Sequence, residues 1–168
     1  MQINSQRFGV IEFDEDAVLS FPAGIIGFPR EHSFALIPHQ GSSFLAWLQS
    51  LSKPELAFPV VSAHYFGNTY PDVPVTPAAH AAGLQGKENE FAVLLVLCAP
   101  IGQPATVNLL APIVINTETR TGGQVILDGS RFSTREVFVA TSPAPAEATP
   151  AAQAEGDNSE PLPALAAG

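Results

Sequence analysis

The sequence predicts an all-β fold: a compact antiparallel β-barrel-like single domain with one short connector helix and a disordered C-terminal tail. Strand-like runs recur about every ten residues with turn signals between them, a spacing typical of sandwiches and barrels. Helical patterns are scarce, so alternating βαβ units are not expected. Closure into a barrel also removes the edges that such apolar strands would otherwise expose.

The first part of the chain predicts a hairpin followed by a loop. Residues 8–13, FGVIEF, alternate apolar residues with small or polar ones, and residues 17–21 form a second strand after an acidic turn. Residues 22–29, PAGIIGFP, hold two prolines and two glycines, so we expect a loop with a fixed path.

The remaining strands are expected at residues 33–38, 43–50, 56–63, 91–98, 105–110, 112–117, 123–128 and 136–140. The run at 91–98 is almost wholly apolar, which indicates a central strand. A two-turn helix is expected where Thr76 can cap, Pro77 can take the first position and Gly83 can end it. The glycines of residues 119–124 predict a hairpin turn with positive φ.

Residues 106–116, TVNLLAPIVIN, contain a proline inside an apolar run. Proline lacks the N–H that a ladder needs, so it is tolerated where pairing stops or changes partner. We therefore expect two strands joined by a bend at Ala111 and Pro112. Asn108 and Asn116 flank this bend and are placed to satisfy the backbone groups that it leaves free.

The chain is expected to divide into a folded domain, residues 1–140, and a tail, residues 141–168, rich in alanine, proline and acidic residues. The tail holds four of the 16 acidic residues and none of the seven basic ones, which leaves the domain a net charge of −5. Such a domain is not expected to bind nucleic acid directly. It suits a basic protein partner, although acidity that only aids solubility is an equal alternative.

Nothing in the sequence indicates an enzyme, a cofactor or a metal site. The four histidines follow no metal-ligand spacing, and nucleophile and phosphate-loop motifs are missing. Cys98, the single cysteine, ends an apolar strand and is expected to be a core residue. No signal peptide is recognised, and the longest apolar run falls short of the roughly 20 residues of a membrane helix, so a cytoplasmic protein is expected.

In order along residues 1–140, several segments resemble the FliW family of bacterial flagellar assembly factors. Residues 21–28 resemble its pattern F-x-x-G-L/I-x-G-F. Residues 43–50 resemble P-F-x-x-L-Q-S, with serine in place of proline, and residues 106–116 fit T-x-N-L-x-A-P-I-V-I-N throughout. Residues 63–87 are only loosely similar, and the tail has no counterpart.

The resemblance implies a β-barrel-like protein that is not an enzyme and has two alternative protein partners. One is flagellin, held in the cytoplasm before export, and the other is CsrA, an RNA-binding repressor of flagellin translation. In that scheme free FliW binds CsrA and relieves repression, and abundant flagellin occupies FliW and lets CsrA repress again. The antagonism of CsrA is expected to be allosteric rather than mimicry of RNA.

Ten residues are candidates for partner binding, each with a structural alternative. The acidic cluster either attracts a basic partner or is a solvated turn. The two residues at the end of the glycine loop either make apolar contact with a partner or anchor the core. Four polar residues of the motif segments either contact a partner or tie strands together. In that order these residues are Glu12, Asp14, Glu15 and Asp16; Phe28 and Pro29; Gln49, Ser50, Asn108 and Asn116.

Two other classes of function are considered. A small barrel can carry a ligand or an active site, and this alternative predicts a deep pocket on which His64, Tyr65 or Trp47 converge. RNA binding through stacking on Tyr65, Phe66 and Tyr70 is disfavoured because no basic residue lies among them.

Overall fold

The computed structural model describes residues 1–69 and 75–139 of the 168-residue chain. These residues form an all-β domain with one short α-helix, as the sequence predicts. The predicted tail and Tyr70 lie outside the described residues, so what was expected of them stays a prediction.

The strands are β1 (Gln2–Ser5), β2 (Gly9–Glu12), β3 (Val18–Ser20), β4 (Ser33–Pro38), β5 (Leu45–Ser50), β6 (Ala57–Ser62), β7 (Phe91–Cys98), β8 (Thr106–Val107), β9 (Ile113–Asn116), β10 (Thr121–Gln124) and β11 (Glu136–Val137). The helices are α1 (Val75–Ala81) and the 3-10 helices η1 (Glu15–Ala17), η2 (Ala63–Thr69) and η3 (Glu88–Glu90). The predicted bounds of β4 and β7 are confirmed at both ends.

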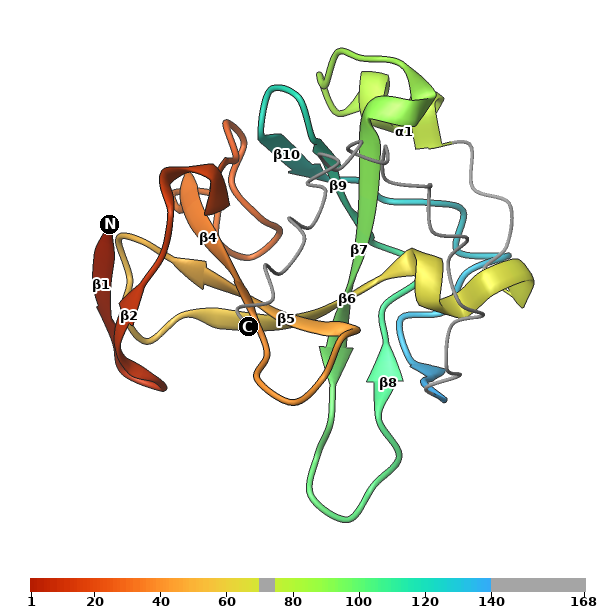
Figure 1. Cartoon of the computed structure of the whole chain (residues 1–168). Helices are drawn as coiled ribbons and strands as arrows, with labels where there is room; N and C mark the ends of the chain where they lie inside the picture. The colour runs from red at the N-terminus through yellow and green to blue at the C-terminus, as the bar shows by residue number, and fades with distance from the viewer. Residues whose placement is uncertain (70–74, 140–168) are drawn as a thin grey trace, which may run out of the picture.

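Seven strands close into a barrel (Figure 1). Around the barrel the order is β7, β6, β5, β4, β3, β10 and β9, and β9 pairs again with β7. These pairs are antiparallel except β3 with β10, where Thr121 lies opposite Ser20 in a parallel bridge. The antiparallel barrel is therefore confirmed, with one parallel seam. β8 and β11 extend the sheet from the end of β7, and β1 with β2 forms a separate two-stranded sheet.

The barrel interior is filled with apolar side chains. Side chains of a strand alternate between its two faces, and the inward set includes Phe21, Phe34, Leu48, Val60 and Ile113, each 0% exposed. The rings of Phe21 and Phe34 meet edge to face with their centroids 5.3 Å apart. A filled interior counts against the alternative of a ligand-carrying barrel.

The three side chains that a ligand pocket was expected to use do not converge. Trp47 lies on the outer face of β5 and packs against Phe8, with ring centroids 5.1 Å apart. His64 is exposed on η2, and the Tyr65 hydroxyl donates a hydrogen bond to the Ser43 carbonyl at 2.7 Å.

Two further apolar clusters cover the outside of the barrel. One joins the outer faces of β6 and β7, at Val61 and Leu95, to η2 and to the chain before β11. In the other, α1 covers β9, with Ala79 packed in the same cluster as Val114. The sheet is therefore covered on both faces along much of the barrel, which explains why its strands read as near-continuous apolar runs.

The predicted hairpin of residues 8–13 with residues 17–21 is wrong. β2 pairs with β1, in a register that places Ile3 opposite Ile11, and β3 pairs with β4. The acidic turn forms η1, which leads the chain from the hairpin into the barrel. β1 escaped prediction because its sequence, QINS, has a single apolar residue.

The hairpin predicted around residues 119–124 exists as β9 with β10, but the prediction that its glycines form the turn is wrong. Gly122 and Gly123 lie inside β10, and the residue with positive φ near this turn is Arg120, at 55°. Gly122 is needed for another reason, because a Cβ atom there would lie 2.6 Å from the Phe21 ring. The glycine allows β10 to lie directly against the core.

The bend predicted at Ala111 and Pro112 is confirmed. It separates β8 from β9, and Oδ1 of Asn108 accepts a hydrogen bond from the Ala111 N–H at 3.0 Å. Pro112 is fully buried, and its carbonyl accepts a hydrogen bond from the Val125 N–H at 3.0 Å. The proline stands where pairing with β7 is interrupted and where the partner on the other side changes from β11 to β10.

α1 differs from the predicted helix at its start. Thr76 lies inside α1 rather than at its cap, and its buried hydroxyl has no hydrogen-bond partner among the described residues. The predicted end is confirmed, because Gly83 has a φ of 81° and its N–H donates to the His80 carbonyl. The N–H of Leu84 donates to the Ala79 carbonyl, which completes the C-terminal cap.

Cys98 is exposed, so the prediction of a core cysteine is wrong. It pairs with Thr106 of β8 at the far end of β7, past the part of β7 that forms the barrel wall. The loop that follows projects beyond the barrel (Figure 1), and Ile101 in this loop is 103% exposed. The apolar run indicated a strand but not how far it continues past the core.

Candidate protein-binding site

The predicted site residues fall into a buried group and an exposed group. The buried group is Gln49, Ser50 and Asn116, each at most 2% exposed. Asn108, the fourth amide or hydroxyl residue of the motif segments, is half-buried. The exposed group is Glu12, Asp14, Glu15, Asp16 and Pro29, with Phe28 half-buried. The protein itself encloses the first group, so the second group offers more of its side-chain atoms to a partner.

Gln49 ties three segments together from inside. Its Oε1 accepts a hydrogen bond from the Ser5 hydroxyl at 2.8 Å, which joins β5 to β1. Its Nε2 donates to the carbonyls of Ser50 and Leu56, each at 3.0 Å. Both ends of the buried amide are satisfied, as buried polar groups require. The side chain therefore holds the β1–β2 hairpin and the β5–β6 turn to the barrel.

Ser50 fixes the same turn from its other side. Its hydroxyl donates to Oε2 of Glu31 at 2.7 Å and accepts a hydrogen bond from the Lys53 N–H at 3.0 Å. Ser52 also donates to Oε2 of Glu31. These two hydrogen bonds, that from Ser52 first, lower the pKa of the Glu31 carboxyl below its ordinary value.

Asn116 serves the turn between β9 and β10 rather than the bend at Pro112, which corrects the sequence-based expectation. Its Nδ2 donates to the Gln85 carbonyl at 2.8 Å. Its Oδ1 accepts from the N–H groups of Glu118 and Thr119 at 2.9 and 2.8 Å. The amide is placed as a structural tie.

The glycine loop places Phe28 against the barrel. Gly24, with φ of 69°, passes so close to the loop end that a Cβ atom would lie 2.5 Å from the Phe28 carbonyl oxygen. The Phe28 ring meets the Phe58 ring edge to face, with centroids 5.5 Å apart. Phe28 thus anchors the loop, and the exposed apolar atoms belong to Pro29 and to Ile26, which is 53% exposed.

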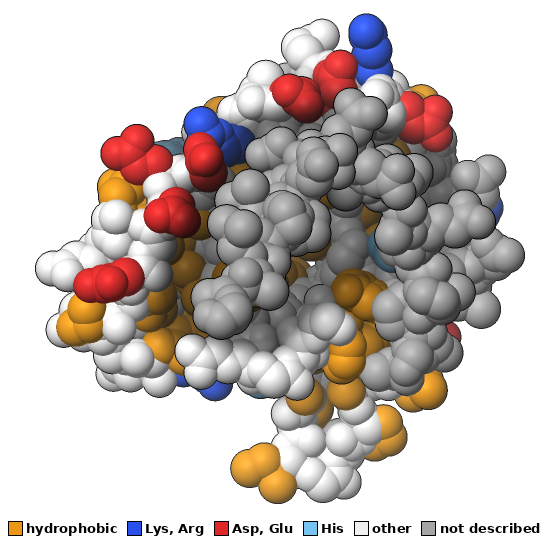
Figure 2. Space-filling view, viewed as in Figure 1, with side chains coloured by type: hydrophobic (Ala, Val, Ile, Leu, Met, Phe, Trp, Pro, Cys, Tyr) orange, Lys and Arg blue, Asp and Glu red, His pale blue; other side chains and the backbone are white. Residues whose placement is uncertain are grey.

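We call Glu12, Asp14, Glu15 and Asp16 the acidic patch. All four side chains are exposed, on the end of β2 and on η1. Acidic side chains gather over this part of the molecule in Figure 2. The guanidinium of Arg120 pairs with the Asp16 carboxylate and donates to the Glu15 carbonyl at 3.3 Å. The Arg120 guanidinium and the Met1 amino group, which donates to the Phe13 carbonyl, are thus two cations against four carboxylates, and the patch stays negative.

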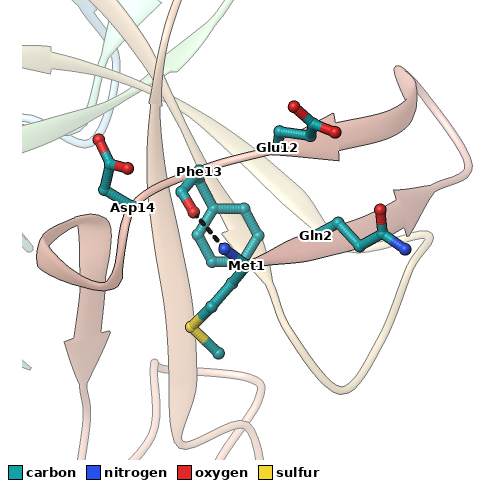
Figure 3. A pocket seen from close by; sticks show the side chains of 5 residues that line it. All are labelled: Met1, Gln2, Glu12, Phe13 and Asp14. Atoms are coloured by element: carbon teal, nitrogen blue, oxygen red, sulfur yellow. Dashed lines mark hydrogen bonds between the residues drawn. The ribbon is translucent and has the colours of Figure 1, made fainter.

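A shallow hollow lies within the acidic patch (Figure 3). Glu12 and Asp14 lie on either side of Phe13, whose carbonyl accepts a hydrogen bond from the Met1 amino group at 2.7 Å. Together with Gln2 these residues line a cavity of about 520 Å³. The two carboxylates are thus held apart on a small rigid frame.

A second hollow, the hairpin groove, adjoins the acidic patch at Glu12. It has a volume of about 490 Å³ and lies between the β1–β2 hairpin and β4 with β5. Val10 and Glu12 line one side, and Ile37 and Trp47 line the other. Sequence reasoning did not find this groove, because its walls come from separate hairpins. The sequence offered one hint, the apolar residue Val10 in the strand of residues 8–13. In the structure the Val10 side chain is 67% exposed.

A third hollow, the barrel mouth, has a volume of about 460 Å³. Its apolar lining includes the half-buried Leu36 and the buried Leu94 and Ile115, which belong to the inner cluster of the barrel. Its lining also includes the Asp16–Arg120 pair. The acidic patch therefore lies between two partly apolar hollows and shares one residue with each.

The described residues carry neither a metal-ligand group nor a membrane-spanning helix. In residues 1–69 and 75–139, no three His, Cys, Asp or Glu side chains form a group that could hold a metal ion. No helix in that part of the chain is long and apolar enough to cross a membrane. His39, which lines the hairpin groove, has a buried Nδ1 without a hydrogen-bond partner there.

Known proteins resemble this chain along almost all of the described residues. The family model described as FliW protein matches residues 2–138. The "Flagellar assembly factor FliW 2" of Desulfotalea psychrophila is 34% identical over 132 residues, 77% of this chain and 85% of that protein. The "Flagellar assembly factor FliW" of Geotalea uraniireducens is 32% identical over 142 residues, 84% of this chain and 86% of that protein.

The fold is similar to a solved structure as well. The "Crystal structure of the flagellar assembly factor FliW" matches with a TM-score of 0.69 and 29% sequence identity. The match covers 82% of this chain and 96% of that one. The barrel described above and the sequence comparison thus agree on one family.

Proposed function

The chain belongs to the FliW family, and from that premise we propose that it is a flagellar assembly factor that binds two proteins in alternation, the repressor CsrA and flagellin. The free protein binds CsrA and relieves the repression of flagellin translation. Abundant flagellin then occupies the protein and releases CsrA. The exchange takes place in the cytoplasm and requires no catalytic step by this chain.

The acidic patch is the observation that carries the CsrA part of the proposal. A protein that binds RNA presents basic surface to neutralise phosphates. The four exposed carboxylates outnumber the Arg120 guanidinium and the Met1 amino group, so the patch attracts such a surface, and a net charge of −5 over residues 1–140 adds steering at longer range. We therefore place CsrA at the acidic patch.

The barrel mouth supports the flagellin part. Flagellin has terminal segments that are unfolded in the monomer and expose apolar side chains, which need an apolar surface during storage. The mouth offers the half-buried Leu36 together with the buried Leu94 and Ile115, and its lining also includes Asp16 of the acidic patch. Partners on adjoining surfaces hinder one another, which supports alternation.

Calorimetric titration with purified CsrA and purified flagellin from the same organism tests the proposal. We expect binding to each partner at micromolar concentration or tighter. Measurable binding to neither protein would overturn the assignment. Binding to only one of them would overturn the proposal that two partners alternate, and the protein would then be either a flagellin chaperone or a CsrA antagonist.

Charge reversal tests the place of the acidic patch. Replacing Glu12, Asp14 and Glu15 by lysine should slow association with CsrA at low salt by about tenfold or more and flatten its salt dependence. The matched control reverses three exposed glutamates outside the patch, Glu55, Glu88 and Glu136, and makes the same change in net charge. Equal slowing by both variants would assign the effect to net charge and remove the patch from the interface.

The allosteric character of the antagonism has its own test. An allosteric antagonist binds CsrA while RNA is still bound and accelerates RNA release, whereas an RNA mimic waits for RNA to leave. We expect the dissociation rate of labelled RNA from CsrA to rise with the concentration of this protein. A dissociation rate that stays constant at all concentrations would indicate simple competition.

A further inference from the structure

We propose that the hairpin groove takes an extended segment of the basic partner, which adds as a third strand to the free edge of β2. The inference rests on the proposed function, because it concerns how that partner is held after the acidic patch has attracted it. It assigns the interface a location, a backbone hydrogen-bonding mode and a side-chain pattern.

The free edge of β2 follows from its pairing. β1 and β2 form a sheet of two strands, so no other described strand pairs with β2. Met1 and Phe13 exchange two backbone hydrogen bonds, of 2.7 and 3.0 Å. Bonded and non-bonded pairs alternate along an antiparallel ladder. Glu12, opposite Gln2, and Val10, opposite Asn4, are therefore non-bonded positions whose N–H and C=O groups point away from β1.

The opposite wall of the groove supplies contact rather than strand pairing. Its apolar surface comes from Ile37 and Trp47, which lie opposite each other on the outer face of β4 and β5. Pro38, between them and the turn, has no N–H to donate. The backbone N–H of His39 is already used by the Leu45 carbonyl at 2.9 Å. An inserted strand thus finds its hydrogen bonds on β2 and its apolar contacts on the other side.

Charge selects the occupant. Glu12 lies on the free edge and joins the groove to the acidic patch, so a lysine or arginine of the inserted segment meets a carboxylate there. At the other end, the Arg7 guanidinium lies 4.8 Å from the centroid of the Trp47 ring and repels a second cation. The preferred segment therefore alternates apolar with polar or basic side chains and carries its positive charge near Glu12.

Strand addition of this kind uses main-chain hydrogen bonds for affinity and side-chain pockets for specificity. A segment of about four residues matches the length of β2 at roughly 3.4 Å per residue. The acidic patch then sets the association rate, and the groove sets the dissociation rate.

Amide hydrogen exchange of the full chain, measured by NMR with and without CsrA, tests the inference. The N–H groups of Val10 and Glu12 should exchange rapidly in the free protein and slow by about tenfold or more in the complex. Those of Ile3 and Ile11, which lie at bonded positions, should be protected in both states and act as internal controls.

Each outcome separates the inference from the proposed function. Binding of CsrA with unchanged exchange at Val10 and Glu12 would overturn the inference and leave the proposed function standing. Failure of CsrA to bind would overturn the CsrA part of the proposed function and the inference with it. Protection that rises with the concentration of this protein alone would assign the edge to a second copy of the chain and overturn the inference.

A pair of proline variants gives an independent test. Val10→Pro removes an N–H on the free edge of β2, whereas Asn4→Pro removes the matching N–H on the opposite edge of the same hairpin. We expect Val10→Pro to weaken CsrA binding by about tenfold or more and Asn4→Pro to leave it unchanged, with thermal unfolding confirming that both fold. Equal weakening would overturn the inference, and the exchange measurement remains decisive where Val10→Pro distorts the hairpin.

Discussion

The barrel body and the β1–β2 hairpin differ in how they use polar groups. In the body, polar side chains such as Gln49 and Asn116 are enclosed and every one of their bonds goes to the protein itself. In the hairpin and around η1, which follows it, four carboxylates and the backbone groups of Val10 and Glu12 are turned outward. Satisfied groups stabilise the fold, and unsatisfied surface groups are available for a partner.

This difference separates recognition of the family from recognition of a partner. The motif residues by which the sequence resembles its family, including Gln49, Ser50 and Asn116, hold turns and strands together. The residues that we propose for CsrA binding lie instead in and just after a short polar hairpin, at the start of the part of the chain that the family model matches. A search for binding residues along the strongest motifs therefore leads to the structural frame.

The sharpest contrast between the two regions is expected from truncation to alanine. Phe34 is 0% exposed and packs on Phe21, so Phe34→Ala should lower the free energy of unfolding by about 3–5 kcal/mol. Val10 is 67% exposed, and Val10→Ala should change it by about 0.5 kcal/mol or less. Urea unfolding of both variants checks the pair. Similar losses would mean that the hairpin contributes to the core.

Replacing a buried amide should lower the free energy of unfolding less than truncating an aromatic core residue does, but more than replacing a surface amide does. Gln49→Leu leaves the Ser5 hydroxyl proton without its acceptor and removes one of the two donors to the Leu56 carbonyl, and it should cost about 2 kcal/mol. The control Gln40→Leu replaces an exposed glutamine and should be close to neutral. Thermal unfolding by circular dichroism compares them. A neutral Gln49→Leu would contradict its role as a tie.

The two asparagines that flank the bend, Asn108 and Asn116, should differ in how much their replacement destabilises the fold. Asn116 makes three hydrogen bonds to backbone groups and is 2% exposed, whereas Asn108 is half-buried and makes one. We expect Asn116→Ala to cost about 1–2 kcal/mol and Asn108→Ala about 0.5–1 kcal/mol. The order of their urea midpoints checks this. The reverse order would mean that the bend, not the β9–β10 turn, depends more on its amide.

The smallest effect is expected at Glu31, at the edge of the body. Its pKa is lowered by hydrogen bonds from Ser52 and Ser50. Its stabilising contribution is thus fully present above the ordinary value of 4.5 and is lost as the pH falls through the lowered pKa of the folded state. Glu31→Gln should reduce the loss of stability between pH 5 and pH 3, measured by urea midpoints. An unchanged profile would show that these bonds contribute nothing to stability.

The sequence predicted the barrel because its strong signals are local. Runs such as β4 and β7 are long enough, and bounded clearly enough, for pattern alone to place both of their ends. β1 failed because a four-residue polar strand has no such signal, and its partner choice depends on distant contacts such as Ser5 with Gln49. The prediction for Gly122 was wrong because the Phe21 ring, which leaves no room for a side chain there, lies about a hundred residues away in the chain.

Of the candidate site, the sequence predicted only the acidic patch. The acidic patch is contiguous in sequence and could be read directly, but the hairpin groove and the barrel mouth join segments that only the fold brings together. The exposure of Cys98 and the enclosure of Gln49 likewise depend on how far each strand extends beyond its neighbours. Tertiary packing, and not residue type, decides these positions.

A displacement experiment tests the alternation of partners most directly. A preformed complex of this protein with fluorescently labelled CsrA is titrated with flagellin, and fluorescence anisotropy follows CsrA. The account predicts that flagellin displaces CsrA completely, with an apparent affinity that weakens in proportion to the CsrA present. A stable complex that contains all three proteins, or no displacement at saturating flagellin, would contradict it.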